Sequence, residues 1–261
     1  MTARHSPHIH VMVEAAEKAG RALTRDFGEV EQLQVSKKGP GDFVSTADLK
    51  SEKILREELA KARPSYGFLL EEGGEIKGND STIRWIIDPL DGTTNFLHGV
   101  PHWCISIALE REGEIVAGVI HDPIKNEIFH AEKGTGAFSG RKRLRVAGRI
   151  SLNDALVLIG DDTQTHIALP SGCRQRRMGS ACLDLAYIAA GRFDAYWETG
   201  LHPWDKAAGG LIVKEAGGYI TEIDGGKNFT FGNGILAANA TLHGDILKQL
   251  KTAVQPARTA S

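Results

Sequence analysis

The chain has 261 residues, of which 41% are hydrophobic and 25% are charged. This composition is ordinary for a globular protein, and the length suffices for one large domain or two packed subdomains. The 31 basic and 33 acidic residues give a formal net charge of -2, so no global positive field attracts nucleic acid or an anionic membrane. A small polar ligand fits this charge better.

The cysteines and the N-terminus favour a cytoplasmic protein. Cys104, Cys173 and Cys182 are the three cysteines, and they lack CxxC spacing, which argues against a disulfide framework and a structural zinc site. The first ten residues have no apolar run typical of a signal peptide, and no later run reaches the roughly 18 apolar residues that span a bilayer. We therefore expect no membrane association.

The N-terminal half, residues 1–150, is predicted to be α+β and to carry most of the candidate metal ligands. Apolar spacing indicates a helix over residues 11–27, and a second helix is expected from about residue 48 to Pro64. Six strands are predicted from alternating or short apolar runs: residues 30–37, 67–70, 83–87, 104–110, 115–121 and 127–131. The last three are expected to form an antiparallel meander.

The C-terminal half, residues 151–261, is predicted to be α/β and to carry Asp205 and substrate contacts. Its pattern alternates strand, helix, strand, helix and strand: residues 155–159, 180–190, 193–198, 204–216 and 219–223. Pro203 at the entry and Gly217 at the exit mark the last of these helices.

The stretch WIIDPLDGTTNF, residues 85–96, is the most informative for chemistry. We expect its strand to end at Asp88 and Pro89 to force a turn. Asp91 comes three residues after Asp88, and Gly92 lets the backbone approach a ligand closely. Two carboxylates so close together repel each other unless a cation lies between them, and hard oxygen ligands favour magnesium or manganese over zinc. The backbone amides that follow Gly92 can cradle a phosphate.

This stretch also has a purely structural explanation, because aspartates often satisfy the amides of a turn. Other motifs are excluded by spacing. The DxDGT loop of haloacid-dehalogenase phosphatases has aspartates two apart, whereas Asp88 and Asp91 are three apart. The sequence has no GxSxG elbow or Walker A loop, and GTGAFSG at residues 134–140 misses the GxGxxG spacing, which predicts a hairpin turn instead.

DPLDGTTNF together with GLHPWDKAAGGLIVKEAGG, residues 200–218, resembles the two signatures of the inositol monophosphatase family. The resemblance extends over nearly the whole chain, from VSKKGPGDFVSTAD through the pair Glu71 and Glu72 to GSACLDLAYIAAGRFDAYWETG. It implies a layered αβαβα sandwich of the inositol monophosphatase and fructose-1,6-bisphosphatase type. It also implies a homodimer and a magnesium-dependent, commonly lithium-sensitive phosphatase site between the two halves.

The resemblance implies two or three magnesium ions, for which manganese can substitute. One ion would be held by Glu71, Asp88 and the backbone carbonyl of Leu90. A second would be held by Asp88, Asp91 and Asp205, and Glu71 would orient a third through water. Metal ions of this kind lower the pKa of a bound water and stabilise a leaving alkoxide, so no covalent enzyme intermediate is required.

The same resemblance assigns residues to the attacking water and to the substrate. The catalytic set is Asp48, Glu71, Thr93 and Lys37, in which Asp48 and Thr93 position the water and Lys37 lies near it. The substrate-binding set is Gly92, Thr93, Gly179, Ser180, Ala181 and Glu198, in which Glu198 would accept hydrogen bonds from substrate hydroxyls.

Several of these residues have structural alternatives. An aspartate such as Asp205 in the first turn of a helix often stabilises the helix dipole, and residues 179–181 can simply start a helix. Glu198 can be an ordinary acid at a strand end. The basic residues near them, Arg174, Arg176 and Arg177, form either a solvated loop or a binding site for a second phosphate or a protein partner.

Three departures from the family pattern affect these expectations. Leu70 and Gly73 replace the glycine and serine that commonly flank the glutamate pair, which bears on the third metal ion and on lithium sensitivity. The segment 160–174 is shorter than expected, which bears on substrate access and on dimer contacts.

We therefore expect a phosphoric monoester hydrolase that acts on myo-inositol monophosphate or a similar polyol phosphate. Histidinol phosphate, fructose 1,6-bisphosphate, NADP and 3'-phosphoadenosine 5'-phosphate remain alternative substrates. A non-enzymatic alternative is a regulatory protein that binds RNA polymerase or RNA, although the near-neutral charge makes nucleic acid an unlikely partner.

Overall fold

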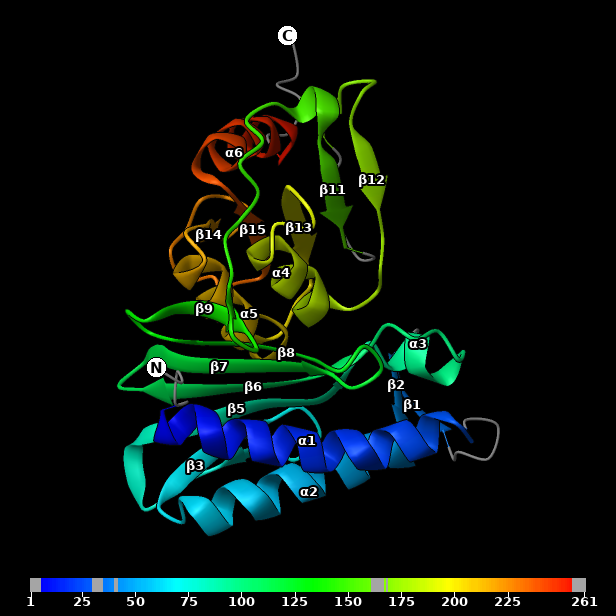
Figure 1. Ribbon diagram of the computed structural model, residues 1–261, viewed down its shortest axis with the longest axis vertical. Coiled ribbons are helices and arrows are strands. Elements are labelled where there is room, and N and C mark those ends of the chain that lie inside the picture. Colours follow the sequence, from blue (N-terminus) through cyan, green and yellow to red (C-terminus); the bar gives the residue numbers. More distant parts are fainter. Residues whose placement is uncertain (1–5, 30–34, 40–41, 161–166, 168, 255–261) are drawn as a thin grey trace, which may run out of the picture.

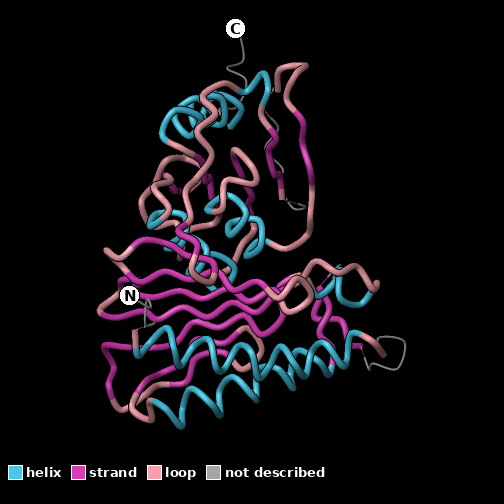
Figure 2. Tube along the Cα trace, in the orientation of Figure 1, coloured by secondary structure: helices cyan, strands magenta, loops and turns pink. Residues whose placement is uncertain are grey.

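Five layers of helix and sheet are stacked along the long axis of the molecule (Figure 1, Figure 2). The computed structural model describes residues 6–29, 35–39, 42–160, 167 and 169–254, and the description excludes the side chains of residues 35–39, 42–44, 253 and 254. The order of layers is a helix pair, an eight-stranded sheet, a second helix pair, a five-stranded sheet and one helix. The predicted αβαβα sandwich is confirmed.

The first layer consists of α1 (Pro7–Phe27) and α2 (Thr46–Ala62). The α1 helix begins four residues before the predicted start because Ser6 accepts a hydrogen bond from the amide of Ile9 and so caps the helix. Its apolar face is fully buried against the large sheet, and Met12 and Ala16 have no exposed surface. The burial of this face fixes α1 on the sheet.

The large sheet has the strand order β10-β9-β8-β7-β6-β5-β3-β4, and it is antiparallel except for the β3 and β5 pair. Its strands are β3 (Tyr66–Leu70), β4 (Gly74–Ile76), β5 (Asp80–Asp91), β6 (Cys104–Arg111), β7 (Glu114–Asp122), β8 (Glu127–Glu132), β9 (Gly136–Ser139) and β10 (Lys142–Arg143). The predicted meander is confirmed as β6, β7 and β8. The stretch 134–140 was expected to be only a turn, but β9 occupies most of it because Ala137 and its neighbours pair with β8.

The middle layer holds α4 (Ala181–Ala189) and α5 (Pro203–Glu215), which lie between the two sheets. Every residue of α4 is buried, and α5 is buried from Lys206 to Val213. One continuous hydrophobic core joins these helices to the inner faces of both sheets. The two halves of the chain therefore share this core.

The smaller sheet has the order β12-β11-β13-β15-β14, and α6 (Ala240–Val254) covers its outer face. Its strands are β11 (Leu156–Ile159), β12 (Arg174–Arg176), β13 (Ala195–Thr199), β14 (Tyr219–Thr221) and β15 (Gly234–Ala238). The sequence did not predict β12, β15 or α6. The β12 strand is wholly polar and exposed at an edge, so it lacks the alternation that marks a strand.

Short elements complete the description: β1 (Val35–Gly39), β2 (Asp42–Ser45), α3 (Thr93–Leu97) and a 3-10 turn at Leu152–Asp154. The β1 and β2 strands pair with each other in a separate antiparallel hairpin. The first part of the strand predicted over 30–37 lies outside the described residues. No helix among those described is long and apolar enough to cross a bilayer.

Candidate active site

The β5 strand delivers Asp88 and Asp91 to one end of the large sheet. Asp88 pairs with Ser106 of β6 and Asp91 pairs with Cys104, with an irregularity of the ladder between them. The prediction that the strand ends at Asp88 was wrong, because a bulge accommodates Pro89, which has no N–H to donate, and pairing resumes at Asp91. The bulge keeps both carboxylates on ordered backbone.

Asp205 reaches the same place from the first turn of α5. The ligand oxygens of Asp88, Asp91 and Asp205 all lie within 4.8 Å of one another. Asp205 also accepts a hydrogen bond of 2.6 Å from the amide of His202, as a capping residue does. The two explanations considered for Asp205 are therefore compatible, since a carboxylate that caps α5 also belongs to the acidic cluster.

Burial and mutual repulsion disfavour the charged forms of this cluster. The pKa of Asp88 is raised well above its usual value, first by burial and then by Glu71 and Asp91. The pKa of Asp205 is raised in the same way, by burial and by Asp91. Burial raises the pKa values of all three carboxyls, and a cation among them would stabilise the charged forms.

Asp91 is the best stabilised of the three, through donors from the second half of the chain. Its carboxylate accepts hydrogen bonds from the hydroxyl of Ser180 and, at 3.0 Å, from the amide of Cys182. Burial still raises its pKa, and these hydrogen bonds offset part of the effect. Of the three carboxylates, Asp91 therefore accepts the hydrogen bonds that best stabilise a negative charge.

The hydroxyl of Ser180 ties α4 to this cluster. Ser180 also caps α4, since its hydroxyl accepts from the amide of Leu183 at 3.4 Å, and Gly179 before it has a φ of 75°. The alternative that residues 179–181 merely start a helix is thus correct as local structure, and the same residues contact Asp91. Helix capping and proximity to the acids do not exclude each other.

Glu71 lies beside the cluster at the end of β3. Its amide donates to the carbonyl of Ile87 at 3.3 Å, and its charge contributes to the raised pKa values of Asp88 and Asp205. The loop after it is held by Glu52, whose carboxylate accepts from the amides of Glu72 at 2.9 Å and Gly73 at 3.3 Å.

Sequence reasoning did not identify Glu52. The signal was its spacing of four residues from Asp48, which places both acids on one face of α2. Both side chains are buried, which is unusual for acids on a surface helix.

Thr93, just after β5, contacts Asp48 in the first turn of α2. The hydroxyl of Thr93 lies 3.1 Å from a carboxylate oxygen of Asp48 and 3.0 Å from the carbonyl of Leu90. Asp48 also accepts from the amide and hydroxyl of Ser45, at 2.9 and 2.5 Å. Burial raises the pKa of Asp48 although these hydrogen bonds lower it. Lys37 lies on β1, and its side chain falls outside the described part of the structure.

Gly92 and Asn95 join the acidic stretch to the second half. Gly92 has a φ of 87°, and a Cβ there would lie 3.0 Å from the carbonyl of His102, so a side chain is excluded. The side-chain amide of Asn95 donates to the carbonyls of His102 and Met178, at 2.8 Å in each case. Asn95 lies within the motif, but its role was not predicted from the sequence.

Glu198 lies on β13 within electrostatic reach of Asp205, whose pKa it raises. It accepts a hydrogen bond from the buried hydroxyl of Tyr196. A Cβ at Gly160 would lie 1.9 Å from its carboxyl carbon, so a side chain at residue 160 would displace the Glu198 carboxylate from this position. Arg177 donates to the carbonyl of Gly160 at 2.9 Å and thus lies at this end of the site.

The other two basic residues, Arg174 and Arg176, lie on the exposed edge strand β12. The segment 161–166, together with residue 168, lies outside the described residues. The expectation about the short loop over 160–174 therefore stays a prediction.

The donor set fits a hard divalent cation. Cys104 and Cys182 also lie close to Asp91, but burial raises the pKa of the Cys104 thiol to about 12, so it remains protonated. Carboxylates are thus the ligands that the cluster offers, and oxygen ligands suit magnesium or manganese. The layered fold and the acidic cluster fit a metal-dependent phosphatase.

Comparison with known proteins agrees with this class. The model of the inositol monophosphatase family matches residues 5–255. The chain belongs to this family and is a phosphoric monoester hydrolase of the corresponding type.

Individual relatives resemble the chain along almost its full length. An inositol-1-monophosphatase of Mesorhizobium japonicum is 53% identical over 256 residues, which cover 93% of this chain and 96% of the relative. The Nus factor SuhB of Escherichia coli K12 is 39% identical over 89% of this chain and 91% of its own. The crystal structure of the extragenic suppressor protein suhB from Bartonella henselae matches with a TM-score of 0.90 and 50% identity, covering 95% of this chain and all of the other.

Proposed function

We propose that the protein hydrolyses a polyol monophosphate, with myo-inositol monophosphate as the first candidate, and that magnesium is its metal. The observation that carries this proposal is the convergence of Asp88, Asp91 and Asp205 within 4.8 Å, with Asp88 and Asp91 buried and Asp205 half-buried. Such a cluster is electrostatically unfavourable by itself, and a divalent cation removes the repulsion.

The residues that would hold the ions are Glu71, Asp88, the carbonyl of Leu90, Asp91 and Asp205. Two or three magnesium ions bound here would lower the pKa of a water and neutralise the charge of the leaving alkoxide. Manganese would replace magnesium, because both prefer oxygen ligands. The third ion and lithium sensitivity depend on the Glu71 loop, where Leu70 and Gly73 differ from the family pattern.

Thr93 and Asp48 would orient the attacking water. The Thr93 hydroxyl donates its proton to Asp48 or to the carbonyl of Leu90, so the lone pairs of its oxygen are left to accept a proton of the water. Asp48 is buried, and its raised pKa makes it a stronger base than an exposed aspartate. We assign Lys37 to the same water.

The substrate phosphate would lie against Gly92, Thr93 and residues 179–181, and Glu198 would accept hydrogen bonds from the polyol. Support for an inositol phosphate comes from relatives named inositol-1-monophosphatase at 53% identity. In this proposal the enzyme is a cytoplasmic homodimer. Sedimentation analysis at micromolar concentration tests the dimer.

A phosphate-release screen with and without magnesium tests this function. The substrates are myo-inositol 1-phosphate, histidinol phosphate, fructose 1,6-bisphosphate, NADP and 3'-phosphoadenosine 5'-phosphate. We expect the fastest turnover with inositol phosphate, complete loss of turnover in chelator and recovery on addition of magnesium. Undiminished turnover in chelator would refute the metal assignment, and preference for another ester would refute the substrate assignment. Inhibition by millimolar-range lithium is also expected.

A second candidate function is suggested by the relatives named Nus factor SuhB, one of which is 39% identical. In this alternative the protein regulates transcription by binding RNA polymerase or RNA. The net charge of -2 offers little attraction for RNA. An RNA mobility shift that weakens with salt, or co-purification with RNA polymerase, would favour this function over the phosphatase.

A further inference from the structure

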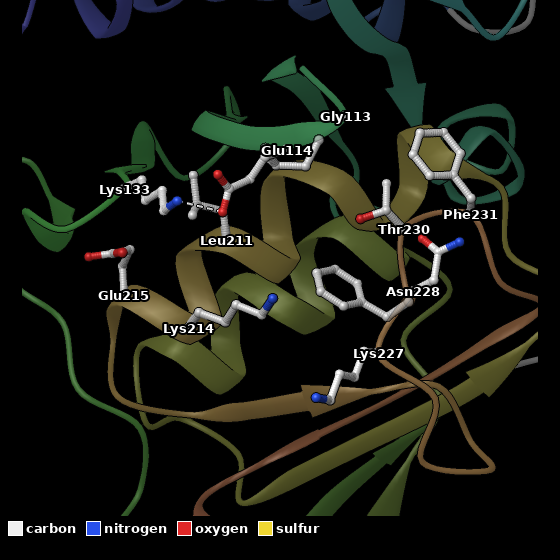
Figure 3. Close-up of a pocket in the computed structure, with 12 residues that line it drawn as sticks. Gly113, Glu114, Lys133, Leu211, Lys214, Glu215, Lys227, Asn228, Thr230 and Phe231 are labelled. Atoms are coloured by element: carbon white, nitrogen blue, oxygen red, sulfur yellow. Dashed lines mark hydrogen bonds and ion pairs between the residues drawn. The ribbon is translucent and has the colours of Figure 1, made fainter. Parts of the chain in front are cut away.

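A cavity separate from the acidic cluster lies where the outer end of α5 meets the turn between β6 and β7 (Figure 3). It encloses about 250 Å³, and the segment 227–231 closes its other side. None of Glu71, Asp88, Asp91 and Asp205 lines it. The cavity is therefore a different place from the proposed phosphatase site.

The cavity has an apolar floor and an aromatic wall. Phe229 is 5% exposed, Leu211 of α5 is also 5% exposed, and Ile115 lies beside them. Phe231 is 43% exposed and stands at the edge of the cavity. Such a surface can bury a flat apolar group, and the guanidinium of Arg84 lies 5.8 Å from the centre of the Phe231 ring.

Two lysines that form no ion pair with any described residue supply positive charge to the cavity. The ammonium of Lys214 lies 4.5 Å from the centre of the Phe229 ring, and Lys227 lies on the segment below (Figure 3). Within the part of the chain that the structure describes, no carboxylate forms an ion pair with either lysine. Burial lowers the pKa of Lys214, although Glu114 counteracts this and Lys133 reinforces it.

The acids that line the cavity are already engaged. Glu114 pairs with Lys133 at 2.5 Å. Glu215 accepts hydrogen bonds of 2.8 Å from the amides of Gly134 and Gly136. The cavity therefore has a net positive charge beside its aromatic side chains.

We propose that this cavity is a second ligand site, which binds a small aromatic carboxylate whose ring lies against the apolar lining of the cavity and whose charge pairs with Lys214 and Lys227. The volume lies below the roughly 300–1,000 Å³ of pockets for drug-sized ligands, so one ring with one anionic group fits better than a nucleotide. Thr230 and Asn228 line the cavity and offer further hydrogen-bonding groups.

The site is connected to the acidic cluster through α5. Asp205 lies in the first turn of this helix and Lys214 lies nine residues later, a rise of about 13.5 Å. A ligand that shifts or stiffens the outer end of α5 acts on the same rigid element that positions Asp205. The proposed site is therefore an effector site, and this part of the inference rests on the proposed function.

Calorimetric titration of the metal-free protein with benzoate, benzamide and acetate tests the binding. Benzamide keeps the ring without the charge, and acetate keeps the charge without the ring. We expect benzoate to bind at least tenfold more tightly than either, and Lys214→Met to weaken benzoate by about tenfold. Lys53→Met, which removes an exposed lysine on α2, is the matched control and should leave benzoate binding unchanged. Equal affinities for benzoate and benzamide, or an unaffected Lys214→Met variant, would overturn the site.

A magnesium titration with and without saturating benzoate tests the coupling. We expect benzoate to change the magnesium affinity and magnesium to change the benzoate affinity by the same factor. Unchanged affinities would overturn the effector role. Benzoate binding in a protein that binds no magnesium at all would refute the proposed function while supporting the second site.

Discussion

The Thr93 hydroxyl lies 3.1 Å from the Asp48 carboxylate, and this contact joins the end of the acidic stretch to the first turn of α2. Residues 45 positions apart in the chain meet here, and both are partly or fully buried. If Asp48 and Thr93 orient the attacking water, removing the hydroxyl should affect turnover more than folding.

Thr93→Val preserves the shape of the side chain and removes its hydroxyl. We expect turnover to fall by roughly 10²-fold or more, because a positioned proton acceptor contributes about that much. Thr93→Ser retains the hydroxyl and should recover most of the rate. Steady-state kinetics together with circular dichroism distinguish this result from misfolding. If the Thr93→Val protein keeps near-normal turnover, Thr93 is not a catalytic residue.

Asp91→Asn tests the metal ligands. The substitution keeps the size of the side chain and the oxygen that accepts from Ser180 and Cys182, but it removes the charge that a cation needs. Turnover should fall by orders of magnitude, and calorimetry should show weaker magnesium binding. The metal-free variant should melt at the wild-type temperature or above it. A folded Asp91→Asn protein with normal turnover would contradict the ligand assignment.

The raised pKa of Asp88 predicts how stability depends on pH. The folded pKa lies above the unfolded value, so the neutral carboxyl stabilises the fold at low pH, and this contribution is lost as pH rises from about 4 through the folded pKa. Asp88→Asn stays neutral at every pH. Without metal, the variant should therefore gain stability relative to the wild type as pH rises, measured as the difference in melting temperature.

Magnesium should reverse this difference, because it stabilises the ionised wild-type cluster. A difference between Asp88→Asn and wild type that stays constant from pH 4 to pH 8 would show that Asp88 is not held in an unfavourable charged state.

Glu198→Gln tests substrate recognition. A charge-assisted hydrogen bond to a substrate hydroxyl is worth roughly 1.5–3 kcal/mol, or about ten- to a hundredfold in binding. The Michaelis constant for inositol phosphate should rise by that factor, while an ester without neighbouring hydroxyls should be hydrolysed almost as before. Tyr196→Phe removes the hydroxyl that donates to Glu198 and keeps the carboxylate, so it should have the smaller effect.

The two esters separate the outcomes. If Glu198→Gln slows the hydrolysis of both esters equally, Glu198 belongs among the catalytic residues. If it changes the hydrolysis of neither ester, the proposal of a polyol substrate loses its main support.

Several features of the molecule were predictable from the sequence alone. The spacing of apolar residues, together with the proline and glycine residues at helix ends, predicted α1, α5 and the meander of β6, β7 and β8. These elements could be predicted because they depend on residues that are neighbours along the chain. Asp88 and Asp91 were predicted to lie close together since only two residues separate them. The family resemblance predicted the layered fold, which the structure and the family match confirm.

Tertiary structure decided the rest. Asp205 meets Asp88 only because α5 packs between two sheets, and no local pattern specifies that contact. The bulge at Pro89, the edge strand β12 and the buried acid Glu52 likewise depend on partners distant in the chain. The pKa values of the clustered carboxyls also depend on the tertiary structure. The sequence supplies the carboxylates, and burial raises their pKa values because it removes the water that would stabilise their charges.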